Sequence, residues 1–378
     1  MSRSTVSNAI EPVRASQGTK MSASFHPLKI ADVRREIDDA VSLRFELPES
    51  LRDTFRFTPG QHLTLRAAID GEEVRRNYSI CAAPHEEELR VAIKRISGGA
   101  FSTWANQALR PGDTLDVMAP HGSFTWAFDP TRAATYAGFA GGSGITPILS
   151  LLKTALAVEP ESSFTLLYGN RASNSIMFLE ELAALKNRFM DRLQIYHFLE
   201  DEEEEVELFN GRLDSVKVGD VLRSLVDPAA IDAAFICGPG PMMDAVEAGL
   251  ESAGVPRERI LIERFTVGAM SAAQAAAARE LERKAAGRKV QVTLEGRRRT
   301  LAFDAEKGSI LENARAAGLP APFACKAGVC ATCRAKLLRG EVTMKANYGL
   351  SAEEVEQGYV LTCQAVPLTD DVELDYDA

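Results

Sequence analysis

The 378-residue sequence contains no run of 18 apolar residues, so the usual signal of a membrane-spanning helix is missing. The first 24 residues are rich in serine with scattered arginine, and they lack the apolar stretch of a secretory signal peptide. We expect residues 1–24 to form a disordered tail, with Met21 as an alternative start. The composition leaves a transit peptide open, but nothing indicates secretion, so we expect a cytoplasmic protein.

Strong positive charge is absent as well. The formal net charge is −10, which argues against nucleic acid as a partner. Part of the negative charge lies in the run EDEEEE at residues 200–205. A solvated loop is the simplest interpretation of this run, and a docking patch for a basic partner is the alternative.

Histidine is scarce, and the sequence shows no arrangement typical of a nucleophilic hydrolase. The five histidines, at positions 26, 62, 85, 121 and 197, form no metal-ligand spacing. No Ser–His–Asp pattern stands out either. We expect surface or packing roles for these histidines.

Cysteine, in contrast, is concentrated near the C-terminus. Cys325, Cys330 and Cys333 follow the spacing C-x4-C-x2-C, and Cys363 stands alone further on. This spacing is typical of plant-type [2Fe–2S] ferredoxins, in which four thiolates hold two irons. Gly328 and its small neighbours allow such a loop to wrap closely around a cluster. The alternatives are a structural zinc site, which is usually built from paired short knuckles, and disulfides, which suit a small secreted domain.

From residue 25 to about residue 130, apolar and polar residues alternate in short runs separated by turn residues, which predicts a small antiparallel β-barrel. One run carries Arg76, Tyr78 and Ser79. Their side chains suit a pyrophosphate, a flavin ring and a ring nitrogen, respectively. A strand bearing arginine and tyrosine more often has only a structural role, so this motif is weak by itself.

A second motif strengthens the first. The strand ending at Lys94 leads into Gly98 and Gly99, and a helix begins close to Ser102. A helix N-terminus presents free N–H groups and a positive dipole end to a phosphate. A glycine-rich turn with a serine in the first helical turn is the alternative, but the two motifs together favour FAD.

From residue 131 to 268, strands alternate with helices, which predicts an α/β domain with a doubly wound parallel sheet. Its first strand leads into a glycine-rich turn, GGSGITP, where a helix begins. We expect a dinucleotide pyrophosphate at this helix N-terminus, bound by Gly142, Ser143, Gly144 and Thr146. Arg171, at the end of the next strand, is placed to pair with a 2′-phosphate, which favours NADPH over NADH; an ordinary surface arginine is nearly as good an interpretation.

The C-terminal part of the chain is predicted to be a separate α+β domain. Residues 269–288 are mostly strong helix formers with little apolar surface, and we expect a partly helical linker there. Residues 289–378 open with a predicted hairpin, continue with a helix that ends at Gly318, and then enter the cysteine loop. This order is that of a β-grasp ferredoxin.

The motifs resemble those of the ferredoxin–NADP reductase superfamily, with R-x-Y-[ST] at residues 76–79 and G-x-G-x-x-P at residues 142–147, joined to a plant-type ferredoxin domain. The resemblance covers about residues 25–378. It implies an FAD pyrophosphate at Gly99 and Ser102, and an E-x-F ending, Glu263 and Phe265, near the flavin. It also implies that Cys237, Gly238 and Pro239 lie beside the nicotinamide. The expected catalytic residues are Ser79, Cys237 and Glu263, and Lys94 and Gly98 complete the expected binding set.

The order of the three parts and the runs PGQH, RNYS and CKAGVC resemble the reductase subunits of oxygenase complexes that epoxidise the phenylacetyl-CoA ring. This resemblance implies FAD, a [2Fe–2S] cluster and NADPH, with NADH as an alternative, and oxygenase subunits as partners. A reductase of another oxygenase, hydroxylase or demethylase is one alternative. A zinc-stabilised regulatory flavoprotein without a redox chain is another.

Overall fold

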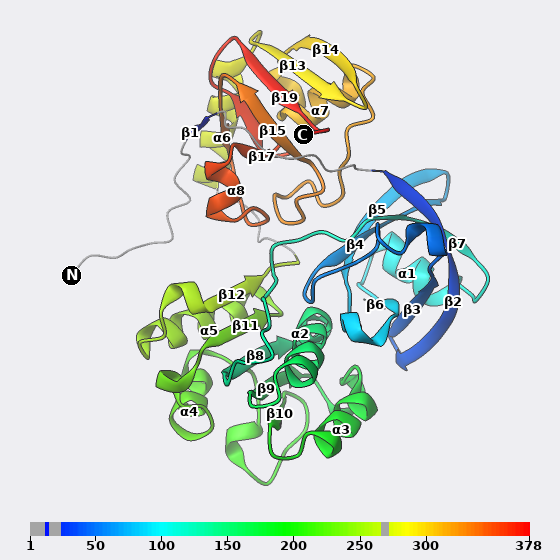
Figure 1. Ribbon diagram of the computed structural model, residues 1–378. Coiled ribbons are helices and arrows are strands. Elements are labelled where there is room, and N and C mark those ends of the chain that lie inside the picture. Colours follow the sequence, from blue (N-terminus) through cyan, green and yellow to red (C-terminus); the bar gives the residue numbers. More distant parts are fainter. Residues whose placement is uncertain (1–11, 15–23, 266–271) are drawn as a thin grey trace.

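The computed structural model describes residues 12–14, 24–265 and 272–378, whose elements form three groups along the chain (Figure 1). The first is a six-stranded antiparallel sheet in the order β5-β4-β7-β2-β3-β6. Ile80 and Val91 form an isolated bridge that connects its two outer strands, so the sheet curls into a barrel. Its elements are β2 Phe25–Ile37, β3 Ala40–Glu46, β4 His62–Ile69, β5 Glu72–Ser79, β6 Leu89–Lys94, α1 Ala100–Gln107 and β7 Thr114–Met118.

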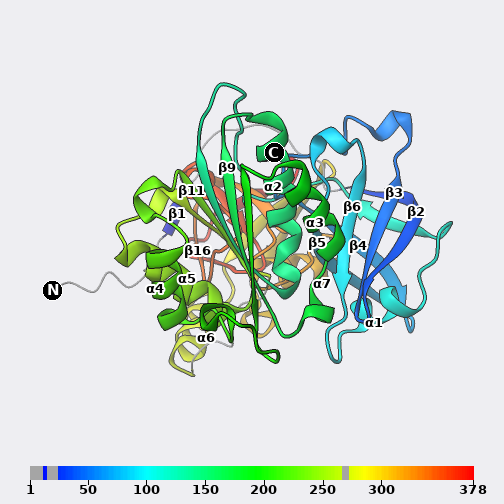
Figure 2. The ribbon, with the colours of Figure 1, turned by 90° about the horizontal axis from the view of Figure 1, so that it is seen from below.

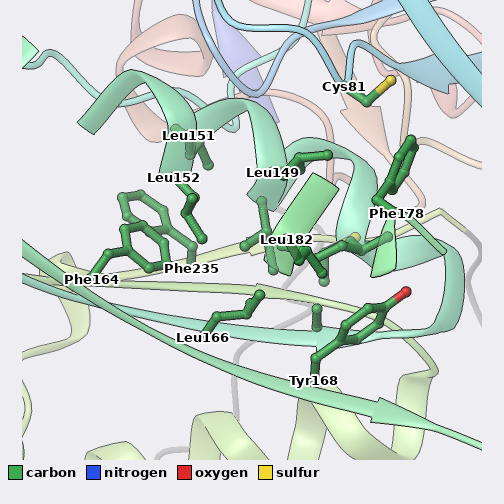
Figure 3. Packing of buried hydrophobic residues seen from close by; sticks show 14 of the residues in the cluster. Cys81, Leu149, Leu151, Leu152, Phe164, Leu166, Tyr168, Phe178, Leu182 and Phe235 are labelled. Atoms are coloured by element: carbon green, nitrogen blue, oxygen red, sulfur yellow. The ribbon is translucent and has the colours of Figure 1, made fainter. Parts of the chain in front are cut away.

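The second group is a five-stranded parallel sheet in the order β10-β9-β8-β11-β12. Two buried clusters line its two faces, one with α2 and α3 and the other with α4 and α5 (Figure 2). In the first cluster, Leu149 and Leu152 of α2 pack toward Phe164 and Phe235 of the sheet (Figure 3). The elements are β8 Thr135–Gly141, α2 Ile145–Val158, β9 Ser163–Asn170, α3 Leu179–Arg188, β10 Leu193–Leu199, α4 Ser215–Ser224, β11 Ala233–Cys237, α5 Gly240–Ser252 and β12 Ile260–Glu263.

The third group contains a mixed five-stranded sheet in the order β14-β13-β19-β15-β17 and a smaller three-stranded sheet, β1-β16-β18. Helix α7 buries Ile310 and Leu311 in the core of this domain. The elements are α6 Ala272–Ala285, β13 Lys289–Leu294, β14 Arg297–Ala302, α7 Ile310–Ala316, β15 Arg334–Arg339, β16 Glu341–Met344, α8 Ala352–Glu356, β17 Tyr359–Leu361, β18 Ala365–Pro367 and β19 Val372–Asp375.

The multidomain fold class expected from the sequence is confirmed: a barrel, a parallel α/β sheet and an α+β domain follow one another along the chain. Two segments differ from their expected descriptions. Within the expected disordered tail, β1 (Pro12–Arg14) pairs with one side of β16, whose other side pairs with β18. Within the expected linker, α6 belongs to the third domain, since Ala285 is buried in its core and Glu282 binds Lys345 at 2.5 Å.

In the ranges that the structure describes, no helix is long and apolar enough to cross a lipid bilayer.

Candidate cofactor sites

Strand β5 and the start of α1 face one cavity of about 460 Å³. Arg76, Tyr78 and Ser79 line it from β5, and Gly99 and Ser102 line it from the turn before α1 and from the helix itself. Two sequence motifs that are separated along the chain are therefore brought together. The turn is closed by Ser102, whose hydroxyl accepts from the N–H of Ile96 at 3.1 Å and donates to the carbonyl of Gly99 at 3.3 Å.

The local backbone explains why glycines stand in this turn. Gly98 has a φ of +72°, which favours glycine, and it lines no part of the cavity. A Cβ on Gly99 would lie 2.6 Å from the Ser102 hydroxyl oxygen. Gly99 is also the N-cap of α1 and provides no side-chain cap, so the first N–H groups of the helix can meet a phosphate.

Unpaired polar atoms in this cavity fit the polar edge of a flavin. The hydroxyl of Ser79 and the amide nitrogen of Asn77 are buried and have no hydrogen-bond partner. Both residues line the cavity, and a bound ring with hydrogen-bonding atoms would satisfy them. The Tyr78 ring lies 5.6 Å from the Phe101 ring, and burial raises the pKa of Tyr78, so its side chain is a neutral aromatic wall.

Residues of the second domain form the opposite wall. Ser143 and Thr146 line the cavity from the start of α2, and Glu263 and Phe265 line it from β12 and the residues after it. The Thr146 hydroxyl donates to the Ser143 carbonyl at 3.0 Å, which shapes the turn. Burial raises the pKa of Glu263 to about 8.

The backbone of the glycine-rich turn before α2 lies very close to the backbone at the end of β11. A Cβ on Gly144 would lie 2.1 Å from the carbonyl oxygen of Cys237, so only glycine fits there. Cys237 itself is fully buried, and burial, followed by the charge of Glu263, raises its thiol pKa. Neither Cys237 nor Gly238 lines this cavity or the neighbouring one, so the structure places the two predicted residues behind the wall.

A second cavity of about 530 Å³ lies at the carboxyl ends of the parallel strands. Gly142, Arg171 and Pro239, all predicted to bind the nucleotide, line it, and Lys94 lines both cavities. Both amide atoms of Asn170, another lining residue, are buried without a hydrogen-bond partner, which fits a polar ligand.

Lys94 connects the two cavities. Burial lowers its pKa, Asp39 at 3.9 Å acts in the opposite direction, and the charge of Arg171 lowers it further. Two cationic side chains therefore lie near each other where an anionic dinucleotide would be bound.

The cysteine loop reaches the first cavity from the third domain, because Cys325 and Cys330 are also among its lining residues. Three residues of the loop have positive φ: Lys326 (56°), Gly328 (77°) and Ala331 (51°). The backbone N–H of Ala327 donates to the Cys325 sulfur at 3.3 Å. The Thr332 hydroxyl lies 3.2 Å from the Cys330 sulfur.

The four cysteines interact as two pairs. Cys330 lowers the pKa of Cys325 to about 5, and backbone N–H groups act in the same direction. Cys333 likewise lowers the pKa of Cys363, whereas the pKa values of Cys330 and Cys333 are raised by their partner thiols and by burial. A [2Fe–2S] cluster needs two thiolates on each of two irons, and this arrangement fits it. Among the described residues, no group of three or more His, Cys, Asp or Glu side chains could hold a single metal ion.

Comparison with known proteins identifies a known domain in each of the three parts of the chain. An oxidoreductase FAD-binding domain matches residues 27–126, an oxidoreductase NAD-binding domain matches residues 139–248, and a 2Fe-2S iron-sulfur cluster binding domain matches residues 292–368. The chain is 45% identical to a subunit of 1,2-phenylacetyl-CoA epoxidase from Escherichia coli (strain K12), over 94% of this chain and 98% of that relative. The chain belongs to the ferredoxin–NADP reductase superfamily.

This reductase chain is an oxidoreductase with FAD-binding, NAD-binding and 2Fe-2S domains, and its curated relatives are reductase components of oxygenase systems. The ferredoxin reductase component of 3-ketosteroid-9-alpha-monooxygenase from Rhodococcus rhodochrous is 35% identical over 92% of this chain and 96% of the relative. Among solved structures, phthalate dioxygenase reductase has the same fold, with a TM-score of 0.55, 23% identity and coverage of 94% of this chain and 100% of that one.

Several cavity residues were not predicted from the sequence. His62 and Asn77 line the first cavity, and Glu200 and Arg212 line the second. Asn77 lies inside the R-x-Y-[ST] motif, so that motif could have indicated it. Glu200 follows β10, and the rule that ligands bind at the carboxyl ends of parallel strands could have indicated it in place of a solvated loop.

Proposed function

We propose that this protein delivers electrons from NADPH to the oxygenase component of a phenylacetyl-CoA epoxidase. The observation that carries the proposal is the first cavity. Its walls combine the flavin motif of β5, the glycine-rich turn before α2, and Cys325 and Cys330 of the cysteine loop. When bound, FAD takes two electrons from a nicotinamide as a hydride and releases them singly to a [2Fe–2S] cluster, which accepts only one at a time.

We assign distinct tasks to the residues around the cavities. Arg76, Gly99 and Ser102 hold the FAD phosphates, while Tyr78 and Ser79 hold the ring. The glycine-rich turn at residues 142–146 and Pro239 hold the nicotinamide dinucleotide. Cys325, Cys330, Cys333 and Cys363 are the cluster ligands.

Glu263 and Cys237 act through position and polarity in this proposal. Hydride transfer requires neither a thiolate nor a strong base. The raised pKa of Glu263 keeps a neutral carboxyl at the cavity wall near pH 7, where it orients a ligand without adding charge.

The choice of terminal enzyme rests on the 45% identity over nearly the full length of the relative. The relatives at 35% and 30% identity belong to 3-ketosteroid-9-alpha-monooxygenase and glycine betaine monooxygenase, so another oxygenase is the second candidate. Arg171 supports NADPH, since a guanidinium suits a 2′-phosphate. Cys81 and Cys237, the two cysteines outside the proposed cluster set, are buried free thiols, which supports a cytoplasmic site of action.

The test is an absorbance spectrum of the purified protein followed by reconstitution. We expect flavin bands with broad iron–sulfur absorption, and NADPH-dependent epoxidation when the oxygenase subunits and phenylacetyl-CoA are added. A colourless protein containing zinc would overturn the redox assignment. A coloured protein that supports a different oxygenase, but not this one, would overturn only the terminal enzyme.

A further inference from the structure

Two histidines of the barrel face each other across an isolated antiparallel bridge, His62 with His121. Their backbones exchange hydrogen bonds of 2.9 and 3.1 Å, and their ring centroids are 4.3 Å apart. Gly122, with a φ of +125°, makes this approach possible, because a Cβ there would lie 2.9 Å from Nδ1 of His62.

Both rings reach across to the cysteine loop of the third domain. Nε2 of His121 lies 2.8 Å from the carbonyl oxygen of Cys330, and Nε2 of His62 lies 3.2 Å from the same oxygen. The two Nε2 atoms are 3.2 Å apart. The shortest of these distances favours an Nε2–H on His121 that donates to the Cys330 carbonyl, and the same hydrogen can be shared with Nε2 of His62 as a second acceptor.

Hydroxyl groups extend the same contact. Thr64 of β4 and Thr332 of the cysteine loop share a hydrogen bond of 3.2 Å, and Nε2 of His121 lies 3.3 Å from the Thr332 hydroxyl. Thr64 and His62 are 0% and 4% exposed, so these bonds are shielded from water. Shielded hydrogen bonds fix geometry more firmly than exposed ones, because an unmade partner would be left unsatisfied.

The carbonyl held in this way belongs to a residue that itself lines the flavin cavity. We infer that His121, together with His62 and Thr64, is a positioning residue for electron transfer between the flavin and cluster sites. This inference rests on the proposed function. The histidine pair holds the cysteine loop against the cavity. His62 lines the cavity itself, whereas His121 lies outside its lining and would not touch a ligand bound there.

The experiment compares His121→Phe, which removes the donor, with His121→Gln, which keeps an amide N–H. His85→Phe, at an exposed histidine, is the matched control. Thr64→Val removes the bond to Thr332, and also the 3.1 Å bond that Thr64 donates to Asn77, with almost no change of shape; Thr64→Ser retains both bonds. If His121→Phe does not fold, the two threonine variants carry the test.

Stopped-flow mixing with NADPH separates flavin reduction from the later reduction of the cluster. Hydrogen–deuterium exchange of residues 326–334 reports the loop independently of turnover. For His121→Phe we expect normal iron content and flavin reduction, cluster reduction slowed roughly tenfold to a hundredfold, and faster exchange in the loop. Thr64→Val should show smaller changes in the same direction, and His121→Gln, Thr64→Ser and His85→Phe should behave as the wild type.

Unchanged cluster reduction and unchanged exchange in both His121→Phe and Thr64→Val would overturn the inference. Loss of iron or of flavin reduction in His121→Phe would also overturn it, because the side chain would then support a cofactor site and not the contact. A wild-type protein that lacks flavin or iron would instead contradict the proposed function.

Discussion

The Glu200 carboxylate lies 2.9 Å from Nε of Arg212, at the edge of the nucleotide cavity. The backbone N–H groups of Glu200 and Asp201 both donate to the carbonyl of Arg171, so the acidic loop and that arginine are adjacent. A carboxylate favours the free 2′-hydroxyl of NADH, whereas guanidinium groups favour the 2′-phosphate of NADPH. We therefore expect coenzyme preference to depend on how these opposed charges are balanced.

Arg171→Ala should raise the KM for NADPH roughly tenfold or more and leave the KM for NADH nearly unchanged. A charge-assisted hydrogen bond contributes about 1.5–3 kcal/mol, and only NADPH has the phosphate that would receive it. Steady-state kinetics with both coenzymes measure the effect, with Arg188→Ala on α3 as a control. Equal effects on the two coenzymes would remove Arg171 from the 2′-phosphate site.

Glu200→Gln should shift the preference further toward NADPH. The substitution removes a negative charge from the cavity edge and releases Arg212 from its ion pair, so a phosphate meets less repulsion and a free guanidinium. The ratio of kcat/KM for NADPH to that for NADH should rise several-fold, which is the size of effect expected from the loss of one exposed charge interaction. A ratio that falls would mean that Glu200 supports NADPH binding.

Cys330→Ser should abolish electron delivery to a one-electron acceptor while NADPH still reduces the flavin. A serine hydroxyl replaces one of two thiolates on an iron, and the flavin wall otherwise keeps its residues. Iron content, visible absorbance and cytochrome reduction, measured on the same preparation, report the outcome. Parallel loss of flavin reduction would contradict the separate roles assigned to the two sites.

Glu263→Gln should become more stable relative to the wild type as the pH rises from 5 to 8. Burial raises the folded-state pKa of Glu263 to about 8, against about 4.3 in an unfolded chain. Between these values the unfolded state binds fewer protons, so the wild type loses stability with increasing pH, and glutamine removes this loss. The difference should level off above pH 8, where the carboxyl is ionised in both states.

Two groups face the Glu263 carboxyl. Nδ1 of His62 lies 3.9 Å from it, and Cys237 lies opposite Glu263 on the neighbouring strand. Arg76 and Lys94 line the same cavity. Calorimetric unfolding of the apoprotein at several pH values measures the difference between variant and wild type. A difference that does not change with pH would mean that Glu263 is already ionised in the folded protein.

Gly144→Ala should impair binding of both coenzymes and lower the thermal midpoint. The added methyl group would meet the carbonyl of Cys237 at 2.1 Å, and a backbone atom cannot move aside as a side-chain end can. The cost of such overpacking is about 1–3 kcal/mol or more. Gly240→Ala is the matched control, because a methyl group at that position would meet nothing within 4 Å. Equal stability of the two variants would contradict the close contact between the turn at Gly144 and the Cys237 carbonyl.

The cysteine spacing and the R-x-Y-[ST] motif could be interpreted from the sequence, because each is a local pattern whose chemistry depends on residues close together in the chain. Helix α4 was not predicted. Gly219 lies inside it and lowers the helix propensity of the segment, and its start depends on a cap, Asp214, which accepts from the N–H groups of Val216 and Lys217.

Contacts between distant segments were beyond sequence reasoning. His62 and His121 were expected to have only surface or packing roles, since neither has a neighbouring partner in the sequence. Their common target, the Cys330 carbonyl, belongs to a different domain. Likewise, α6 is composed of strong helix formers but has few apolar residues, so its attachment through Glu282 and Ala285 could not be foreseen.

Because Cys325 and Cys330 complete the flavin cavity, one of its walls comes from a domain that is synthesised after the other two. Domains generally fold as units from the N-terminus during translation. On the ribosome, the barrel and the parallel sheet can thus present an open trough to FAD before the iron–sulfur lobe exists. Closure by that lobe completes the cavity, so the order of the domains along the chain sets the order in which its walls can form.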